Sequence, residues 1–307
     1  MKKDLLKLLD LTKEEIVKIL NLADQLKYDQ RHRLTHNYLQ GRTLAMIFEK
    51  SSTRTRVSFE TGMYQLGGNA LFLSSNDIQL GRGEPIEDTA RVLSRYCDGI
   101  MIRTFEQEKV EKLAEYSSVP VINGLSDFAH PCQVLADLMT VREYRAVLEG
   151  TKVAWIGDGN NMANSLIVGA LKCGMSITAA CPEGYEPDKV VLDFAAAYPD
   201  AFKLIRDPKE AAAGADVLFT DVWLSMGQEG ESEKIEKFKG FQINEELMAI
   251  AAPKAMVQHC LPAHRGEEIT VGVFEAHANE IFDEAENRLH AQKAVMVMLI
   301  APDEVEG

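Results

Sequence analysis

The sequence predicts an α/β protein made of two doubly wound parallel-sheet domains, joined by long helices and with an active-site cleft between them. Its 307 residues exceed a typical single domain, so two domains of similar size are expected. Short apolar runs alternate with helical patterns along the chain, the order that builds parallel sheets covered by helices. A long polar helix that ends at Gly150 separates two such series and marks the domain boundary.

The first predicted domain, residues 1–149, opens with a helix. Thr12-Lys13-Glu14-Glu15 has the capping-box pattern, and apolar residues follow it at helical spacing. The apolar runs that predict strands lie at 43–48, 70–73, 99–103 and 119–122. The intervening helical patterns lie at 57–66, 86–96, 106–116 and 132–148.

The second predicted domain, residues 150–278, repeats this alternation. Strands are expected at 152–156, 176–180, 202–205, 217–220 and 256–258. Helices are expected at 162–173, 188–198, 208–213 and 244–251. The last segment, 279–307, begins with one helix to residue 301, which we expect to pack back toward the N-terminal domain.

Composition predicts a soluble cytoplasmic protein that acts on small molecules. The longest apolar runs, such as Ala294 to Ala301, are too short to span a bilayer, and the charged N-terminus does not resemble a signal peptide. The five cysteines are odd in number and form no Cys-x-x-Cys pair, which favours a reducing compartment. A net charge of −14 argues against nucleic acid or an anionic membrane as a partner.

The most distinctive segment follows the first predicted strand. Ser52, Thr53 and Thr55 supply hydroxyl groups, and Arg54 and Arg56 supply guanidinium groups. A strand that ends where a helix begins presents free backbone N–H groups and the positive end of the helix dipole, and both attract anions. The alternative is an exposed capping segment, but a cap needs only one hydroxyl. We therefore expect a phosphate-like anion to bind here.

Four ordered segments together resemble the aspartate/ornithine carbamoyltransferase superfamily. They are Ser52-Thr53-Arg54-Thr55-Arg56, His130-Pro131-Cys132-Gln133, Asp221-Val222-Trp223-Leu224-Ser225-Met226-Gly227 and His259-Cys260-Leu261-Pro262. The first two segments mark the superfamily, and the last two are typical of its ornithine-specific branch. Four motifs in order over nearly the whole chain form a far more specific signal than any one of them.

This resemblance implies a role for each matching residue. Carbamoyl phosphate is expected to bind Ser52, Thr53, Arg54, Thr55, Gln79, Arg103, His130, Gln133, Cys260, Leu261 and Arg288. Ornithine is expected to bind Asn160, Asp221, Ser225 and Met226. Arg103, His130 and Cys260 are the expected catalytic residues, with no cofactor and no metal. The family also implies a homotrimer or a multiple of trimers, in which Gln79 serves a neighbouring subunit's site.

Without the resemblance, these residues have ordinary structural interpretations. Arg103 could be a solvated cation at a strand end, Arg288 could form an ion pair on a helix surface, and Cys260 could be an inert core thiol. His130, Gln79 and Asp221 could be turn or loop residues. A zinc site built from His259, Cys260 and His264 lacks the usual ligand spacing and a fourth ligand.

The resemblance implies transfer of the carbamoyl group from carbamoyl phosphate to the δ-amine of L-ornithine, which gives L-citrulline and phosphate in arginine metabolism. Aspartate, putrescine or acetylornithine are alternative acceptors. A dinucleotide-dependent oxidoreductase is a second alternative because Gly157-x-Gly159 follows a predicted strand, although Met162 replaces the third glycine of that fingerprint. A non-catalytic amino-acid sensor is a third, and it should lack part of the arginine and cysteine set.

Overall fold

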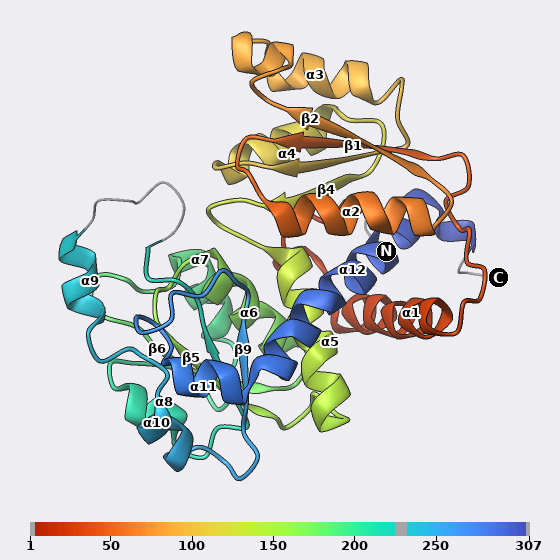
Figure 1. Ribbon diagram of the computed structural model, residues 1–307. Coiled ribbons are helices and arrows are strands. Elements are labelled where there is room, and N and C mark those ends of the chain that lie inside the picture. The colour runs from red at the N-terminus through yellow and green to blue at the C-terminus, as the bar shows by residue number, and fades with distance from the viewer. Residues whose placement is uncertain (1–3, 225–231, 305–307) are drawn as a thin grey trace. The chain divides into compact units, whose positions relative to one another are not determined.

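The computed structural model describes residues 4–224 and 232–304, which belong to two compact units (Figure 1). Unit 1 contains the chain up to Met139 and again from Asn287, and unit 2 is Thr140–Glu286. Helices α5 (Pro131–Arg145) and α12 (Ala278–Ile300) contribute residues to both units. Each unit holds one sheet whose strand pairs are all parallel, which confirms the predicted fold class.

The sheet of unit 1 has the strand order β2-β1-β3-β4. Its strands are β1 (Thr43–Phe48), β2 (Asn69–Ser74), β3 (Gly99–Arg103) and β4 (Val121–Leu125). The helical elements of this unit, besides α5 and α12, are η1 (Leu8–Asp10), α1 (Lys13–Arg31), α2 (Thr53–Gln65), η2 (Gln79–Arg82), α3 (Ile86–Leu93), α4 (Gln107–Tyr116) and η3 (Pro302–Glu304).

Burial on both faces explains why β1 and β3 are almost wholly apolar. On one face, Ile47 and Ile100 pack with Ile86 of α3 and Val110 of α4 in one hydrophobic cluster. Helix α2 covers the other face (Figure 1). A Cβ atom at Gly62 of α2 would lie 2.9 Å from Cε of Met296, so the glycine permits α12 to approach α2 closely.

The capping box predicted for the first helix is present. The Thr12 hydroxyl accepts a hydrogen bond from the Glu15 backbone N–H (3.2 Å), and the Glu15 carboxylate accepts one from the Thr12 N–H (2.8 Å). Two donors at the start of α1 that lack a helical partner are thereby satisfied.

The sheet of unit 2 has the strand order β7-β6-β5-β8-β9. Its strands are β5 (Lys152–Ile156), β6 (Ser176–Ala180), β7 (Phe202–Ile205), β8 (Val217–Thr220) and β9 (Met256–His259). Its other helices are α6 (Asn161–Lys172), α7 (Lys189–Ala195), α8 (Pro208–Ala212), α9 (Ser232–Phe238), α10 (Glu245–Ile250) and α11 (Val271–Ala276). The sequence did not predict α9 and α11.

The strand orders place the distinctive residues at the switch point of each sheet. In unit 1 the chain leaves β1 toward β2 and later returns to β3 on the other side of β1, so the switch lies between β1 and β3. In unit 2 the corresponding point lies between β5 and β8. Open α/β sheets bind ligands at the carboxyl ends of the strands at this point. Ser52 and Arg103 lie there in unit 1, as Asn160 and Asp221 do in unit 2.

None of the helices in 4–224 and 232–304 combines the length and the apolar character needed to cross a lipid bilayer.

Candidate active site

The start of α2 forms the centre of the site in unit 1. Ser52 has extended backbone and caps the helix, since its Oγ accepts a hydrogen bond from the Thr55 N–H at 3.2 Å. The same hydroxyl donates to Thr55 Oγ1 at 3.1 Å. Ser52 therefore agrees both with the interpretation of this segment as a helix cap and with its interpretation as an anion site. It is a helix cap, and it lies at the positive end of a helix of 13 residues.

Two buried arginines converge on Thr55 from distant parts of the chain. Arg103, the last residue of β3, donates from Nη1 to Thr55 Oγ1 at 3.4 Å. Arg288 of α12 donates from Nη2 to the same oxygen at 3.3 Å. Their exposures of 7% and 3% exclude a solvated strand-end cation and a surface ion pair as descriptions of these residues. Buried guanidinium groups beside a helix N-terminus favour a bound anion.

A chain of amide groups holds Arg288 in place. Its Nη1 donates to Gln133 Oε1 (2.7 Å), and its Nε donates to Gln292 Oε1 (2.9 Å). Gln292 in turn donates to Ser58 Oγ (2.6 Å), and Gln133 donates to Asp137 Oδ1 (2.8 Å). Asp137 and Gln292 were not predicted from the sequence. Each lies four residues after the residue that it supports, a spacing that places the two on one helix face.

His130 is buried at the start of α5, directly before Pro131. Burial lowers the pKa of its imidazole well below the usual range, and the positive charges of Arg288, Arg103 and Arg54 lower it further. The ring is therefore neutral at physiological pH, with one N–H donor and one acceptor nitrogen. The arginine charges that add to this effect of burial are the same charges that attract an anion.

Three other predicted residues lie at the surface of unit 1. Arg56 donates to Glu60 Oε1 at 2.9 Å, and its guanidinium group lies 3.7 Å from the Phe72 ring centroid, so it takes no part in the arrangement around Thr55. Thr53 is exposed as the first residue of α2, and Gln79 is exposed in η2. No side-chain hydrogen bond of Gln79 is formed with any residue in the described part of the chain.

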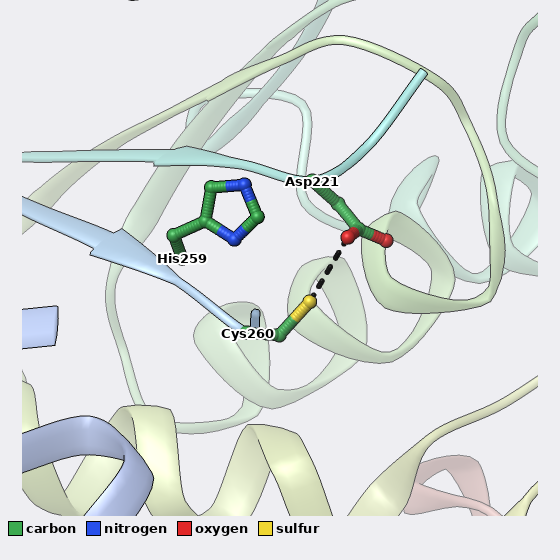
Figure 2. A group of neighbouring side chains, drawn as sticks. All are labelled: Asp221, His259 and Cys260. Carbon is green, nitrogen blue, oxygen red and sulfur yellow. Dashed lines mark hydrogen bonds between the residues drawn. The ribbon is translucent and has the colours of Figure 1, made fainter. Parts of the chain in front are cut away.

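In unit 2, Asp221 is the centre of a second arrangement (Figure 2). The thiol of Cys260 donates to Asp221 Oδ1 at 3.0 Å, as does the Val222 N–H at 2.8 Å. The amide of Asn160 donates to Asp221 Oδ2 at 2.9 Å. Asn160 also caps α6 through its Oδ1, which accepts from the N–H groups of Met162 and Ala163. A carboxylate, a thiol and a helix N-terminus offer partners for both charged groups of an amino acid.

His259 lies beside Asp221 and Cys260 (Figure 2). Its own hydrogen bonds, which the figure does not draw, fix its tautomer. The Leu261 N–H donates to Nδ1 at 2.9 Å, so Nδ1 carries no proton, and Nε2–H donates to Glu268 Oε1 at 3.0 Å. Asp221, His259 and Cys260 have potential ligand atoms within 4.8 Å of one another. Because both ring nitrogens of His259 are engaged, a metal ion could bind His259 only by breaking one of these bonds.

Leu261 has a left-handed backbone conformation, with φ of 57°. This conformation is unfavourable for a branched side chain, and residues held in it are concentrated at functional sites. Leu261 follows Cys260 directly, so the unusual conformation belongs to the loop that positions the thiol.

Gly159, which follows β5, has a packing function in unit 2. A Cβ atom on Gly159 would lie 2.2 Å from the backbone of Glu186 and of Pro187. The space above this glycine is therefore filled by the chain itself. In a dinucleotide fold the corresponding glycine makes room for a pyrophosphate, and this difference argues against the oxidoreductase alternative. Ser225 and Met226 lie outside the described residues.

Comparison with known families matches nearly the whole chain in two parts. Residues 3–143 match the family model described as aspartate/ornithine carbamoyltransferase, carbamoyl-P binding domain. Residues 149–299 match the one described as aspartate/ornithine carbamoyltransferase, Asp/Orn binding domain.

Individual relatives agree with this result. The chain is 56% identical over 302 residues to the ornithine carbamoyltransferase of Pelobacter propionicus, covering 98% of this chain and 99% of the relative. It is 57% identical over 302 residues to that of Syntrophotalea carbinolica, covering 98% of this chain and 100% of the relative. Among solved structures, the ornithine carbamoyltransferase from Pyrococcus furiosus superimposes with a TM-score of 0.92 at 53% identity, over 97% of this chain and 96% of that one.

Proposed function

The chain belongs to the aspartate/ornithine carbamoyltransferase family, and from this membership we propose that it transfers the carbamoyl group of carbamoyl phosphate to the δ-amine of L-ornithine. The products are L-citrulline and phosphate. The observation that carries the proposal is the convergence of two buried arginines on Thr55 beside a neutral, buried His130. This arrangement fits a dianion attached to a carbonyl group.

On the carbamoyl phosphate side, the arginines bind the phosphate and remain bound to it as it leaves. Negative charge grows on the phosphate while the C–O bond breaks, so Arg103 and Arg288 stabilise the transition state as well as the substrate. A neutral His130 can donate one hydrogen bond to the carbonyl oxygen, which becomes an oxyanion in the tetrahedral intermediate. The full set is Ser52, Thr53, Arg54, Thr55, Gln79, Arg103, His130, Gln133, Cys260, Leu261 and Arg288.

On the ornithine side, Asp221 pairs with the α-ammonium group, and the start of α6 at Asn160 attracts the α-carboxylate. Ser225 and Met226 complete the set. The side-chain amine has a pKa of about 10.4 in water, so it must lose a proton before it attacks. The Cys260 thiol orients this amine. The amine releases one proton to solvent and attacks the carbamoyl carbon in its neutral form, which makes the C–N bond. The tetrahedral intermediate then collapses as the C–O bond breaks, and phosphate leaves with the second proton, which the attacking nitrogen gives up.

We assign carbamoyl phosphate binding to residues 1–149 and ornithine binding to 150–278, with 279–307 as a C-terminal helical segment. The descriptions of the families that match 3–143 and 149–299 support this division. We further propose a cytoplasmic homotrimer, or a multiple of trimers, that acts in arginine metabolism. The exposed Leu71 and Phe72 on β2, an edge strand of its sheet, support association through unit 1.

A steady-state assay of citrulline formation tests the proposal. Purified protein is supplied with carbamoyl phosphate and, in parallel, with ornithine, aspartate, putrescine or acetylornithine, and ornithine should be used with the highest kcat/KM. Arg103→Ala should lower kcat/KM for carbamoyl phosphate by at least 100-fold, since a buried charged donor is lost. An unchanged saturation curve for carbamoyl phosphate in this variant would show that the phosphate is bound elsewhere.

A further inference from the structure

Two residues between β1 and α2, Glu49 and Lys50, tie together the three loops that carry the phosphate-binding residues of unit 1. These loops follow β1, β3 and β4. Ser52 and His130 lie in the first and third loops, and Arg103 is the last residue of β3, where the second loop begins. The proposed reaction mechanism gives neither Glu49 nor Lys50 a role.

Glu49 joins the loop after β1 to the loop after β3. Its backbone N–H donates to the carbonyl of Arg103 at 2.9 Å. Its carboxylate accepts a hydrogen bond from the Thr104 hydroxyl, and Lys109 Nζ donates to both of its oxygens, at 2.9 and 3.1 Å. Glu49 therefore holds the backbone of Arg103 and the side chain of Thr104 through one hydrogen bond each.

Lys50 extends this connection to the loop after β4. Its ammonium group forms an ion pair with Asp127, three residues before His130, and lies 4.2 Å from the centroid of the Phe105 ring. The Asp127 N–H donates to the Phe105 carbonyl at 2.7 Å, and the Thr104 N–H donates to the Leu125 carbonyl at 3.0 Å. One ammonium group therefore contacts residues from both neighbouring loops.

The burial of Lys50 is unfavourable for stability by itself. Its exposure is 7%, whereas that of the Asp127 side chain is 62%, so a desolvated ammonium group is paired with a carboxylate that water can still reach. Removing a charge from water is costly, and an apolar side chain of similar volume often gives an equal or more stable protein at such a position. The ion pair is therefore weak evidence that Lys50 serves stability.

We propose that Lys50, supported by Glu49, is a positioning residue for phosphate binding. It acts through the loops that it joins, holding Ser52, Arg103 and His130 at the mutual distances that one phosphorylated ligand requires. The inference rests on the proposed function, because it deepens the role of the same site. Groups that bind one ligand must be held to within a fraction of an ångström, and that precision depends on the residues behind them.

The experiment measures the affinity of the whole protein for inorganic phosphate by titration calorimetry, without turnover. Lys50→Met keeps most of the length of the side chain and removes its charge, and we expect it to weaken phosphate binding about tenfold. Lys50→Arg keeps the charge and should restore most of the affinity. Asp127→Asn alters the exposed partner and guards against a failure of Lys50→Met to fold, and we expect about threefold weaker binding from it.

The control is the ion pair at the opposite ends of the same strands. Arg42 precedes β1 and Asp98 precedes β3, and Arg42 Nη1 lies 2.8 Å from Asp98 Oδ1. Arg42→Met removes a tie between the same two strands but leaves their carboxyl ends untouched. We expect Arg42→Met to leave phosphate affinity within twofold of the wild type. This should hold even if urea denaturation shows that it lowers the free energy of unfolding as much as Lys50→Met does.

Steady-state kinetics distinguish a positioning role of Lys50 from a general disruption of the folded structure. Lys50→Met should raise the KM for carbamoyl phosphate by about the same tenfold factor and leave the KM for ornithine nearly unchanged. Equal weakening by Arg42→Met, no rescue by Lys50→Arg, or wild-type phosphate affinity in Lys50→Met would each overturn the inference. A wild-type protein that binds phosphate but forms no citrulline would instead contradict the proposed function and leave the binding test valid.

Discussion

Among the single residues of the site in unit 1, the arginines are charged, whereas the imidazole of His130 is neutral. Burial is the main reason that the pKa of the His130 imidazole is low, and the positive charges of Arg288, Arg103 and Arg54 lower it further, so the ring stays neutral. A protonated His130 would add a fourth positive charge in a place with little water, at a large cost in free energy. A neutral ring instead offers a hydrogen-bond donor that does not compete with the arginines for the phosphate.

The low pKa of His130 predicts a dependence of stability on pH. The unfolded chain binds a proton at this histidine near pH 6.5, whereas the folded protein does not, so unfolding becomes more favourable as the pH falls below that value. The slope is at most about 1.4 kcal/mol per pH unit for one histidine. His290, whose pKa burial and the nearby Lys293 lower to about 3, acts in the same direction.

Urea denaturation at pH 7.5, 6.5 and 5.5 measures this effect. His130→Gln should lose less of its unfolding free energy than the wild type over this range, because one of the two histidines is gone. The exposed His32 provides a matched control, and His32→Gln should follow the wild-type curve. Parallel curves for His130→Gln and the wild type would mean that His130 titrates normally in the folded protein.

A second prediction concerns the role of the Cys260 thiol in the use of ornithine. Its thiol donates a hydrogen bond to Asp221, and a serine hydroxyl can donate to the same oxygen but is shorter and harder. We expect Cys260→Ser to lower kcat or raise the KM for ornithine about tenfold or more, with affinity for carbamoyl phosphate largely kept. The buried Cys173 of unit 2 is the control, since Cys173→Ser should affect stability more than ornithine use. A folded Cys260→Ser protein that no longer bound carbamoyl phosphate would contradict this role.

At the scale of elements, the sequence predicted the buried strands best. Six strands, β1, β3, β5, β6, β7 and β8, have the predicted bounds, because each is a short run rich in apolar or β-branched residues between two helical patterns. β4 was expected at 119–122 but is Val121–Leu125, since Pro120 has no N–H with which to join the ladder. α2 was expected from residue 57 but begins at Thr53, because Ser52 caps it.

Without the family resemblance, the sequence alone predicts fewer of the site residues than of the strands. Arg288 lies 233 residues from Thr55, and nothing in its local sequence distinguishes it from a surface residue on a polar helix. Only tertiary packing buries it. The short helices α9 and α11 have six or seven residues, too few to show a helical period.

Helix α12 carries a buried lysine that lowers stability. Lys293 is fully buried, donates to His36 Nε2 (2.9 Å) and Gln65 Oε1 (3.0 Å), and has a pKa lowered by burial to about 8. Between pH 8 and about 10.4 the unfolded chain binds a proton that the folded protein lacks. The stability of the wild type should therefore rise with pH in this interval.

Lys293→Met should remove that rise and stabilise the protein by about 1 kcal/mol at pH 7, the gain from removing a buried charge less the two lost hydrogen bonds. Urea denaturation at pH 7 and pH 9.5 measures both effects. Lys18→Met, at an exposed position of α1, should change neither. The explanation fails if Lys293→Met is less stable than the wild type at pH 7 and shows the same rise with pH.

In the assembled protein, Gln79 is the predicted binding residue that we expect to serve a neighbouring subunit. Gln79 is exposed in η2, after the edge strand β2, while the arginines that meet at Thr55 are buried. An exposed glutamine beside an edge strand with apolar residues fits a group that serves a neighbouring subunit. If the proposed trimer forms, each active site therefore needs Gln79 from a neighbouring subunit, so assembly is required for catalysis.

Mixing two defective variants tests that claim. Gln79→Ala and Arg103→Ala protomers, unfolded together and refolded, form hybrid trimers in which an intact Arg103 on one chain can meet an intact Gln79 from its neighbour. Citrulline formation by the hybrids should exceed the mean of the two parent proteins several-fold, because complete sites have been rebuilt. A mixture of Arg54→Ala and Arg103→Ala is the matched control: both changes lie on the same side of the site, so no combination of chains completes it and no gain is expected. Hybrid trimers of the correct mass in solution whose activity equals the parental mean would show that Gln79 acts within its own chain or not at all.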